Sequence, residues 1–468
     1  MKLKYYIVAL LSLINLSSCS DFLNLTPISD ASSANYYKNA SDIESALSGC
    51  YASLQGNNLY GQKLIALTEL RSDNIEDINP GANAGMYYFI DKFTLTSGND
   101  VIRAVWKELY NLIYRCNNIL AHSQVVTDAT LRAQYEGETL FLRSWAYFNI
   151  VQLWGDAPLI LDPITAQEAV KYGRTPISEI YGTLETDLKH VIDNKMLPEV
   201  QTDENLGRAT LAAASALLGK CYLTQKKWSE AASTLDNLIS TQSSQYGLLE
   251  NVEDVFSVDN EMNKEILFAV RWSKTLVGLG QSSYNDYFKD GKTSVDIHLK
   301  EAYEETDARR ALIEYQRVDA NNNVLAKYYD TFDTSTSTVG YDIPLLRWAD
   351  VLLMAAEAHN EVAYDGTENG KAMTYLNAVR NRAGASAYTS AKLSNQSSFR
   401  DAVLLERRLE LPFEMHRWFD MVRTDRAIAD MAKIGQTITK DDYLYPIPKT
   451  EVDIVNDPNR FPQNPGYN

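Results

Sequence analysis

Acidic and basic side chains crowd one stretch near the C-terminal end of the sequence, and this stretch has the residue types of an acid–base site. It holds Glu406, Glu410 and Glu414, followed by Arg417. On a helix Glu406 and Glu410 lie four residues apart and share a face, and Arg417 joins them if Pro412 only kinks the chain. Two carboxylates on one face could serve as the general acid and base of a glycoside hydrolase.

The same residue types also fit a purely structural role. Arg347, Asp350 and Glu357 repeat this mixture of charges along another expected helix. Sets of arginine and glutamate commonly form ion-pair networks that fix how helices pack. An arginine beside a carboxylate lowers its pKa and removes the general acid that hydrolysis needs. We therefore favour the structural interpretation and predict no catalytic residues, while the hydrolase stays an alternative.

Aromatic side chains in two loop-like stretches form a second candidate site, which would bind a ligand rather than transform it. The sequence has 29 Tyr and 7 Trp but only 13 Phe, and rings with polar tips suit half-exposed binding faces. Such rings stack on sugars or grip peptide side chains, whereas neighbouring polar groups bind hydroxyls. We predict a stacking platform of Tyr87, Tyr88 and Trp272; the alternative is that these rings pack against helices. The full set of predicted ligand-binding residues is Arg71, Asp73, Asn74, Tyr87, Tyr88, Trp272, Tyr284 and Tyr287.

Other catalytic and metal-binding patterns are missing from the sequence. There is no H-E-x-x-H, G-x-S-x-G or Walker motif, and the five histidines have no ligand spacing. Asp319, Asn321 and Asn323 imitate the start of a calcium loop, but Val324 stands where that loop needs glycine. We predict no metal and no cofactor. A formal net charge of −17 argues against nucleic acid as a partner, because binding to phosphates needs cationic side chains.

The first residues have the layout of a secretory signal. Lys2 and Lys4 precede an apolar run over 5–16, which is too short to span a bilayer. The order Leu-Ser-Ser-Cys that ends at Cys19 matches a bacterial lipobox. We therefore predict a signal peptide over 1–18 and lipidation of Cys19; the alternative is that this cysteine begins a disulfide-bonded protein. The other cysteines have no paired spacing and are expected to be buried free thiols: Cys50, Cys116 and Cys221.

The periodicity of apolar residues predicts a mainly helical fold with long irregular loops and a few short strands. One segment, Ala214 to Ile239, resembles the tetratricopeptide unit, in which glycine lets two helices approach and small residues fill their crossing. Strand patterns are confined to 265–270 and to a hairpin over 317–329. The expected long loops are 71–100, 241–298 and 330–344. The expected helices cover 41–55, 101–122, 130–153, 176–194, 208–224, 228–240, 345–363, 371–383 and 399–432.

Several motifs resemble, in order and spacing, the SusD/RagB family of surface nutrient-binding lipoproteins. Residues 19–27, Cys-Ser-Asp-Phe-Leu-Asn-Leu-Thr-Pro, are similar to the mature start of that family, although Asn24 stands where Asp is commoner. The segment 141–159, from Phe-Leu-Arg-Ser-Trp-Ala-Tyr-Phe to Trp-Gly-Asp-Ala-Pro-Leu, is close to its most specific internal motif. Further similar segments are 106–110, 207–210, 346–353, 376–382, 417–423, 445–448 and 463–467.

The resemblance implies a helical, tetratricopeptide-containing lipoprotein on the outer face of the outer membrane. Such a protein caps a SusC-like, TonB-dependent transporter as a hinged lid and hands over oligosaccharides or, in RagB-like members, peptides. We therefore expect non-catalytic capture of an oligosaccharide for import, while acidic residues such as Asp73, Glu76 and Asp77 would suit the peptide alternative. The matching motifs belong to the scaffold and carry no ligand residues over. The expected organisation is one SusD-like domain over 19–468, with ligand-facing insertions around 71–100 and 241–344.

Overall fold

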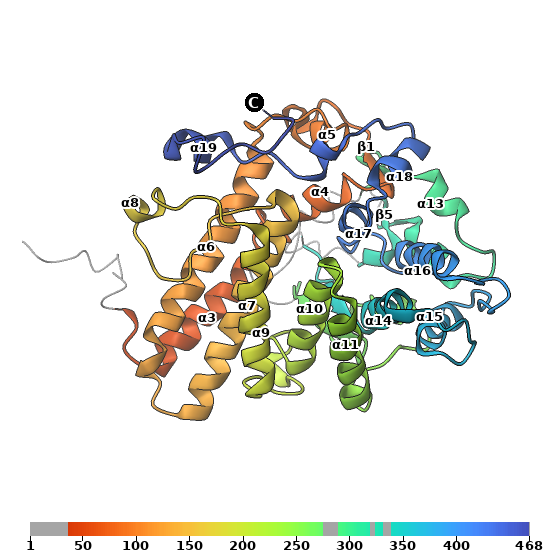
Figure 1. Cartoon of the computed structure of the whole chain (residues 1–468), viewed down its shortest axis with the longest axis horizontal. Helices are drawn as coiled ribbons and strands as arrows, with labels where there is room; N and C mark the ends of the chain where they lie inside the picture. Colours follow the sequence, from red (N-terminus) through yellow and green to blue (C-terminus); the bar gives the residue numbers. More distant parts are fainter. Residues whose placement is uncertain (1–35, 275–288, 319–322, 331–337, 468) are drawn as a thin grey trace, which may run out of the picture.

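The structure is a computed structural model, drawn in Figure 1, and the residues that it describes are 36–274, 289–318, 323–330 and 338–467. The predicted signal peptide over 1–18 and the predicted lipidation site Cys19 lie outside the described residues. Two predicted ligand-binding residues, Tyr284 and Tyr287, also lie outside them.

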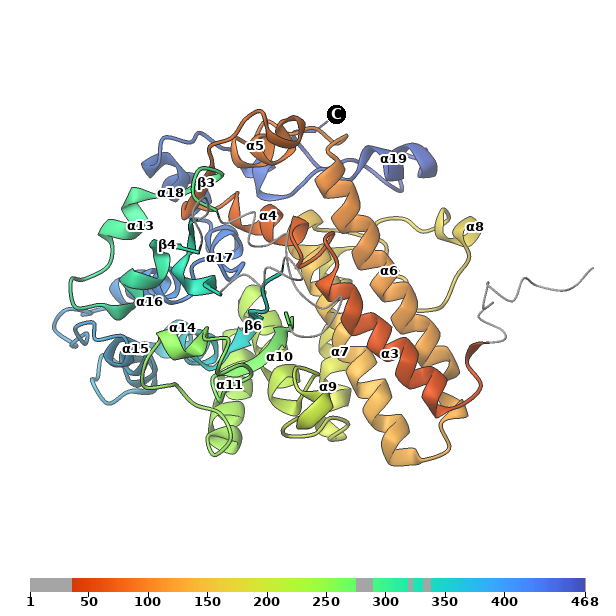
Figure 2. The same cartoon turned by 180° about the vertical axis from the view of Figure 1, so that it is seen from behind.

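Long helices pack against one another in the order of the sequence and form the scaffold of the molecule. α6 packs on α7, α7 on α9, α9 on α10, α10 on α11 and α11 on α14, while α3 lies against α6 and α7 (Figures 1 and 2). Stacked helix pairs of this kind bury a continuous core between neighbours. The helices are α3 (Ala40–Gln55), α6 (Asp100–His122), α7 (Ala129–Trp154), α9 (Ile177–Asp193), α10 (Leu211–Thr224), α11 (Trp228–Gln242), α14 (Trp348–Ala363), α15 (Lys371–Arg382) and α16 (Gln396–Glu410).

The contact between α10 and α11 shows why the sequence forms helix pairs. Gly219 of α10 faces Leu235 of α11, and a Cβ at this glycine would lie 2.6 Å from the leucine Cδ2 atom. The absent side chain therefore allows the two helices to approach closely. Ala231 and Ala232 are buried in the same contact region of α11. The predicted tetratricopeptide unit over Ala214 to Ile239 coincides with this helix pair.

Three antiparallel pairs of short strands supplement the helices in the described part of the chain. β1 (Ile75–Asp77) pairs with β3 (Thr293–Val295), with Ile75 opposite Val295. β4 (Tyr315–Arg317) pairs with β5 (Asn323–Leu325). β2 (Ile266–Val270) pairs with β6 (Ile343–Arg347), and both strands are buried along their whole length. The strand β6 runs directly into α14, so it fixes the start of that helix.

The C-terminal part of the chain returns to the first helices. It lies near α4 and α5 in Figure 1. The Tyr445 hydroxyl donates to the Leu67 carbonyl at 2.6 Å, and the indole of Trp154 donates to the Pro446 carbonyl at 3.1 Å. These contacts join residues that are 378 and 292 positions apart in the sequence. The remaining helices are α4 (Lys63–Glu69), α5 (Met86–Asp91), α8 (Ala166–Ala169), α13 (Ile297–Glu301), α17 (Arg417–Arg423), α18 (Ala427–Lys433) and α19 (Lys449–Val455).

Short 3-10 helices of three to six residues connect several of these elements. They are Ala82–Gly85, Ser123–Val125, Asp203–Asn205, Glu253–Val255, Ala308–Ile313, Ala326–Tyr328 and Lys440–Tyr443.

The helix expected over 399–432 is divided among α16, α17 and α18, which corrects the prediction. The break follows Glu410, because Pro412 has no backbone N–H to continue the helical hydrogen bonds. Phe413 and Met415 then each adopt a φ of 64°, in the left-handed region. The turn therefore points α17 in a new direction.

Two further expectations were incomplete because strands pair over long distances in sequence. The helix expected over 345–363 begins only at Trp348, since its first residues belong to β6. The loop expected over 71–100 contains β1 and α5. Local periodicity cannot show that β6 finds its partner in β2, or β1 in β3.

The expectation about the cysteines agrees with the structure. Cys50, Cys116 and Cys221 are buried free thiols. Within the described ranges, no group of His, Cys, Asp and Glu side chains has the arrangement of a metal site. The described helices include none with both the length and the apolar character needed to cross a membrane.

Candidate functional site

The charged residues near the C-terminus form a buried ion-pair network, as the structural interpretation predicted. Glu406 and Glu410 both accept from the guanidinium of Arg309, at 2.6 and 3.0 Å. Arg380 also contacts Glu406 at 2.6 Å, and Arg347 contacts Glu410 at 3.1 Å. These side chains are at most 3% exposed. The network joins α16 to α15, to β6 and to the turn at Arg309.

Glu414 extends this network toward the turn between α16 and α17. Its carboxylate lies 2.7 Å from the Arg347 Nε atom and 2.5 Å from Lys327 Nζ. Burial alone would raise the pKa of Glu414, but these two cations lower it. The pKa of Glu410 is likewise held below its usual range, because Arg382, Arg347 and Arg309 outweigh its burial. Ionised, paired carboxylates cannot donate the proton that a glycosidase needs, so these residues are not a general acid.

Arg417 does not join Glu406 and Glu410, which corrects the expected arrangement. Its guanidinium instead contacts Asp73 at 2.7 Å and Asp430 at 3.0 Å. The turn after α16 redirects the chain, so Arg417 reaches the segment that follows α4. The acidic residues expected on the helix that begins near Arg347 also pair with different arginines. Asp350 pairs with Arg407, and Glu357 pairs with Arg423.

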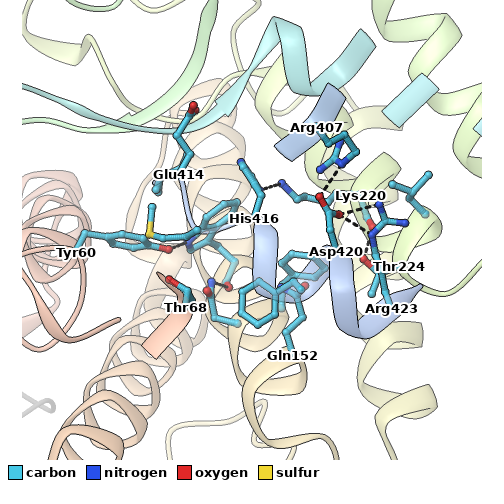
Figure 3. Close-up of a pocket in the computed structure, with 17 residues that line it drawn as sticks. Tyr60, Thr68, Gln152, Lys220, Thr224, Arg407, Glu414, His416, Asp420 and Arg423 are labelled. Carbon is cyan, nitrogen blue, oxygen red and sulfur yellow. Dashed lines mark hydrogen bonds and ion pairs between the residues drawn. The ribbon is translucent and has the colours of Figure 1, made fainter. Parts of the chain in front are cut away.

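A second branch of the network surrounds a small pocket between α7, α10, α16 and α17 (Figure 3). Lys220 donates to His416 Nδ1 at 2.9 Å, and Asp420 accepts from both Arg407 and Arg423. Burial and the neighbouring Lys220 lower the pKa of His416 to about 3, so its ring is neutral. The cavity volume is about 40 Å³. One water needs roughly 10–15 Å³, so this pocket has room for water but not for a sugar ring.

Arg71, Asp73 and Asn74 are at most 3% exposed, and the structure corrects the expectation that they lie at a ligand-facing surface. Arg71 donates to the Asp442 carbonyl and lies 3.9 Å from the centre of the Tyr445 ring. Arg71 therefore holds the C-terminal segment against the residues that follow α4. Asp73 pairs with Arg417, as described above, and Asn74 Oδ1 accepts from Arg408 Nε at 3.0 Å. A local sequence pattern could not reveal these partners, because all of them lie more than 300 residues away.

The structure separates the predicted aromatic platform into buried and accessible rings. Tyr87 is 7% exposed and Trp272 is 5% exposed, and both belong to the main hydrophobic core. Their burial corrects the expectation that they lie at the surface. Tyr88 is half-buried, and Lys92 lies 5.7 Å from its ring centre. The next residue, Phe89, is 43% exposed, although the prediction did not include it.

A larger hollow opens among the loops of the insertion expected around 241–344, and we name it the loop pocket. Its walls come from the segment after α11, from the turn at 308–313, from β4 and from the segment after β5. Its volume is about 490 Å³, within the range of roughly 300–1,000 Å³ that is typical of ligand sites. The lining residues are Glu253, Asp254, Phe256, Ser257, Val258, Asp259, Lys274, Ala311, Leu312, Gln316, Ala326, Tyr329 and Asp330.

The loop pocket combines aromatic rings with polar groups, and contacts with the rest of the protein hold some of these side chains in place. Phe256 and Tyr329 are both half-buried and line the hollow. The Phe256 ring has Lys327 Nζ 4.5 Å from its centre, so the buried charge network supports it from within the protein. Asp330 accepts from Lys274 Nζ at 2.6 Å and from the Gly340 backbone N–H at 2.8 Å. Aromatic rings beside amide and carboxylate groups are the residue types that bind sugar rings and their hydroxyls.

A different hollow lies between α6, α8 and α19, with a volume of about 280 Å³. Its lining is mainly aliphatic and aromatic and includes Trp106, Tyr114 and Ile454. It offers fewer groups that could bind several hydroxyls, so the loop pocket is the better candidate for a hydrated ligand.

The sequence contained a signal for the loop pocket that the prediction used only in part. The insertion around 241–344 was expected to face a ligand, and the pocket lies within it. Phe256 and Tyr329 were overlooked, although both are aromatic residues in stretches without helical periodicity. The polar residues were harder to find, because Asp254, in a 3-10 helix, and Gln316, in β4, come together only in the folded chain.

Two known families match the chain over separate segments that together cover most of it. Residues 271–467 match the family described as the SusD family. Residues 21–223 match the family described as "Starch-binding associating with outer membrane".

Individual relatives and solved structures are also similar to this chain over most of its length. SusD-like protein P2 from Formosa agariphila is 27% identical over an alignment of 530 residues. The alignment covers 99% of this chain and 100% of the relative. SusD-like protein P25 from the same organism is 29% identical over 484 residues, with 90% of each chain covered. A laminarin-binding SusD-like protein superposes with a TM-score of 0.77 and 24% identity, covering 92% of this chain and all of its own.

Surface glycan-binding protein A from Bacteroides thetaiotaomicron, solved in complex with laminarihexaose, has the same fold. Its TM-score is 0.76 and its identity 21%, with 91% of this chain and 99% of that chain covered. The structural similarities show the mainly helical fold with few short strands that the sequence predicted. The two family matches and the SusD-like relatives support the assignment of this chain to the SusD-like family, as the resemblance had indicated.

Proposed function

We propose that this protein binds an oligosaccharide at the cell surface, without transforming it, and that the loop pocket is where the ligand sits. The observation that carries the proposal is the pocket itself, a hollow of about 490 Å³ with two half-buried rings and several hydrogen-bonding groups. Stacking on Phe256 and Tyr329 supplies affinity for a hydrated, neutral ligand without burying charge. Relatives named for binding laminarin or laminarihexaose support the choice of ligand class.

Replacement of Tyr329 tests this proposal directly. Tyr329→Ala should weaken binding by roughly 1–3 kcal/mol, by analogy with the stacking of bases on aromatic side chains. Calorimetric titration with laminarihexaose and with a panel of other neutral oligosaccharides measures the change. Tyr364→Ala is the matched control, since Tyr364 is also half-buried but lines neither the loop pocket nor the hollow between α6, α8 and α19. Equal binding by the wild-type protein and Tyr329→Ala, with the same melting temperature, would place the site elsewhere.

The peptide alternative loses the residues on which it was based but keeps one supporting observation. Asp73 and Asp77 are buried, and Glu76 is paired with Lys92 at 3.2 Å. The acidic lining of the loop pocket would still suit a lysine-rich or arginine-rich peptide. Titration of the same protein with such peptides separates the two candidates. Peptide binding that Tyr329→Ala abolishes, in a protein that binds no oligosaccharide, would favour the peptide.

The proposed cellular role follows the family expectation. The protein would be lipid-anchored at Cys19, face the cell exterior and deliver its ligand to a SusC-like, TonB-dependent transporter in the outer membrane. The description of one matching family, which refers to the outer membrane, supports this location. The order Leu-Ser-Ser-Cys at residues 16–19 supports the anchor.

A further inference from the structure

The lining of the loop pocket carries more negative than positive charge. Among the described residues that line it, four are acidic, namely Glu253, Asp254, Asp259 and Asp330, and one is basic, namely Lys274. Lys274 Nζ lies 2.6 Å from Asp330 Oδ1, so these two charges compensate each other. Three carboxylates therefore remain to set the potential of the pocket.

These three carboxylates have no cationic partner within the described residues. The Asp254 carboxylate accepts from the uncharged side-chain amide of Asn251 at 3.1 Å. Glu253, Asp254 and Asp259 are all exposed, and none takes part in an ion pair in the described part of the chain. Arg310 adjoins a lining residue in sequence but does not itself line the pocket.

Three internal segments of the insertion lie outside the described residues. The internal segments are 275–288, 319–322 and 331–337, and their sequences contain no lysine or arginine. They contain three aspartates, Asp286, Asp319 and Asp333. The sequence of the insertion around 241–344 as a whole contains more acidic than basic residues.

We infer that the loop pocket selects uncharged oligosaccharides and rejects glycans that carry carboxylate or sulfate groups. A hollow lined by one sign of charge concentrates the field inside it, and like charges brought there repel each other. The screening length is about 8 Å at physiological ionic strength, which is comparable to the width of a sugar-binding pocket. The repulsion therefore persists under physiological salt and weakens in concentrated salt. This inference rests on the proposed function, because it concerns the ligand of the same site.

The potential of the pocket can be measured without any glycan. Ser257 lines the pocket, and Ser257→Cys places a thiol there. Methanethiosulfonate reagents transfer a thioalkyl group to such a thiol and release methanesulfinate, and they exist in cationic and anionic forms. We expect the ratio of the cationic to the anionic rate to be about tenfold higher for Ser257→Cys than for Ser397→Cys. Ser397 is exposed on α16, near Arg400, and the parent protein corrects for the native thiols.

Salt and neutralising substitutions provide the decisive controls. The elevated ratio should fall in 0.5 M NaCl and when Asp254→Asn and Asp259→Asn are added to Ser257→Cys. A ratio equal to that of the Ser397→Cys control, or one that these changes leave unaltered, overturns the inference even if glycans bind.

Selection among ligands is then measured with laminarihexaose and a derivative oxidised to carboxylates at C6. The derivative should bind at least tenfold more weakly in 20 mM NaCl, and the difference should shrink in the variant that combines Asp254→Asn with Asp259→Asn. Equal or tighter binding of the carboxylated form overturns the inference while leaving the proposed function intact. If no oligosaccharide of a broad neutral panel binds, the proposed function fails, and the inference about its ligand fails with it.

Discussion

At the scale of single residues, Glu410 shows how the same sequence cluster suggested both chemistry and structure. It is fully buried and accepts from Arg309, Arg347 and Arg382. Glu410→Ala leaves these guanidinium groups without their shared partner inside the protein. We expect a loss of about 3–5 kcal/mol in the free energy of unfolding, as is typical of a broken buried pair, measured by urea denaturation.

A surface ion pair is the control for this loss. Asp453→Ala removes the partner of Lys449 in an exposed pair on α19, and its effect on stability should be close to zero. Glu410→Ala with unchanged stability and abolished ligand binding would instead favour a functional role for the cluster.

Glu69 gives a residue-scale prediction about pH. Burial raises its pKa to about 8, although the Met415 backbone N–H and Lys327 oppose this effect. Between pH 4.5 and 8 the unfolded chain has released this proton and the folded protein retains it, so its contribution to stability is lost as pH rises. Glu69→Gln is neutral at every pH. Its stability relative to the wild-type protein should therefore increase by more than about 1 kcal/mol from pH 5 to pH 8, because one pKa unit corresponds to about 1.4 kcal/mol.

Chemical denaturation at the two pH values measures the Glu69 effect. Glu69→Ala serves as the comparison, since it also removes the acceptor of the Met415 N–H and should be destabilised at both pH values. A Glu69→Gln difference that does not change with pH would show that the carboxyl group is ionised in the folded protein.

At the scale of elements, the turn before α5 contains unusual backbone conformations. Asn83, Ala84 and Gly85 follow one another with φ values of 49°, 54° and 75°. An alanine in this left-handed region costs roughly 1–2 kcal/mol, and its exposed side chain gains no packing there. We expect Ala84→Gly to stabilise the protein by about 0.5–1 kcal/mol, because relief of this strain exceeds the added freedom of glycine in the unfolded chain.

The neighbouring alanine provides the matched control for this turn. Ala82 lies in the same 3-10 helix but outside the positive-φ region, so Ala82→Gly should destabilise the protein by a similar amount. Urea denaturation of both variants tests the prediction. Destabilisation by Ala84→Gly as well would show that the turn does not hold the left-handed conformation in solution.

The helices and the loops differ in how well the sequence predicted them. The long helices before α16 were predicted to within a few residues, because their apolar spacing is strong over several turns, as in α6 and α7. The helix expected over 399–432 was wrong, because it is divided among α16, α17 and α18. The packing of α10 on α11 was visible from Gly219 and the alanines near it. The loops were harder, because their contacts are distant in sequence. The guanidinium of Arg71 lies 4.9 Å from the ring centre of Phe93, which is near in sequence, but it lies closer, at 3.9 Å, to the ring centre of the distant Tyr445. The loop pocket likewise depends on turns that only the folded chain brings together.

At the scale of the whole molecule, the proposed location of the protein rests on the predicted signal peptide and on Cys19. Signal cleavage before Cys19 would leave a chain whose described helices offer no membrane-spanning segment. An acylated cysteine is then the proposed attachment to the outer membrane, together with contact to the transporter. We expect Cys19→Ala to move the protein from the membrane fraction to the soluble fraction, because no diacyl chain holds it.

Fractionation of cells that lack the SusC-like partner tests the anchor most cleanly. Deletion of this partner removes the contact with the transporter, which is the second proposed source of membrane association. In these cells the wild-type protein should stay with the membranes, while Cys19→Ala should leave them after a salt wash. Ser20→Ala, which alters the neighbouring residue but keeps the cysteine, should behave as the wild-type protein does. Firm membrane retention of Cys19→Ala in the partner-deleted strain would contradict lipidation at this site and would require another attachment.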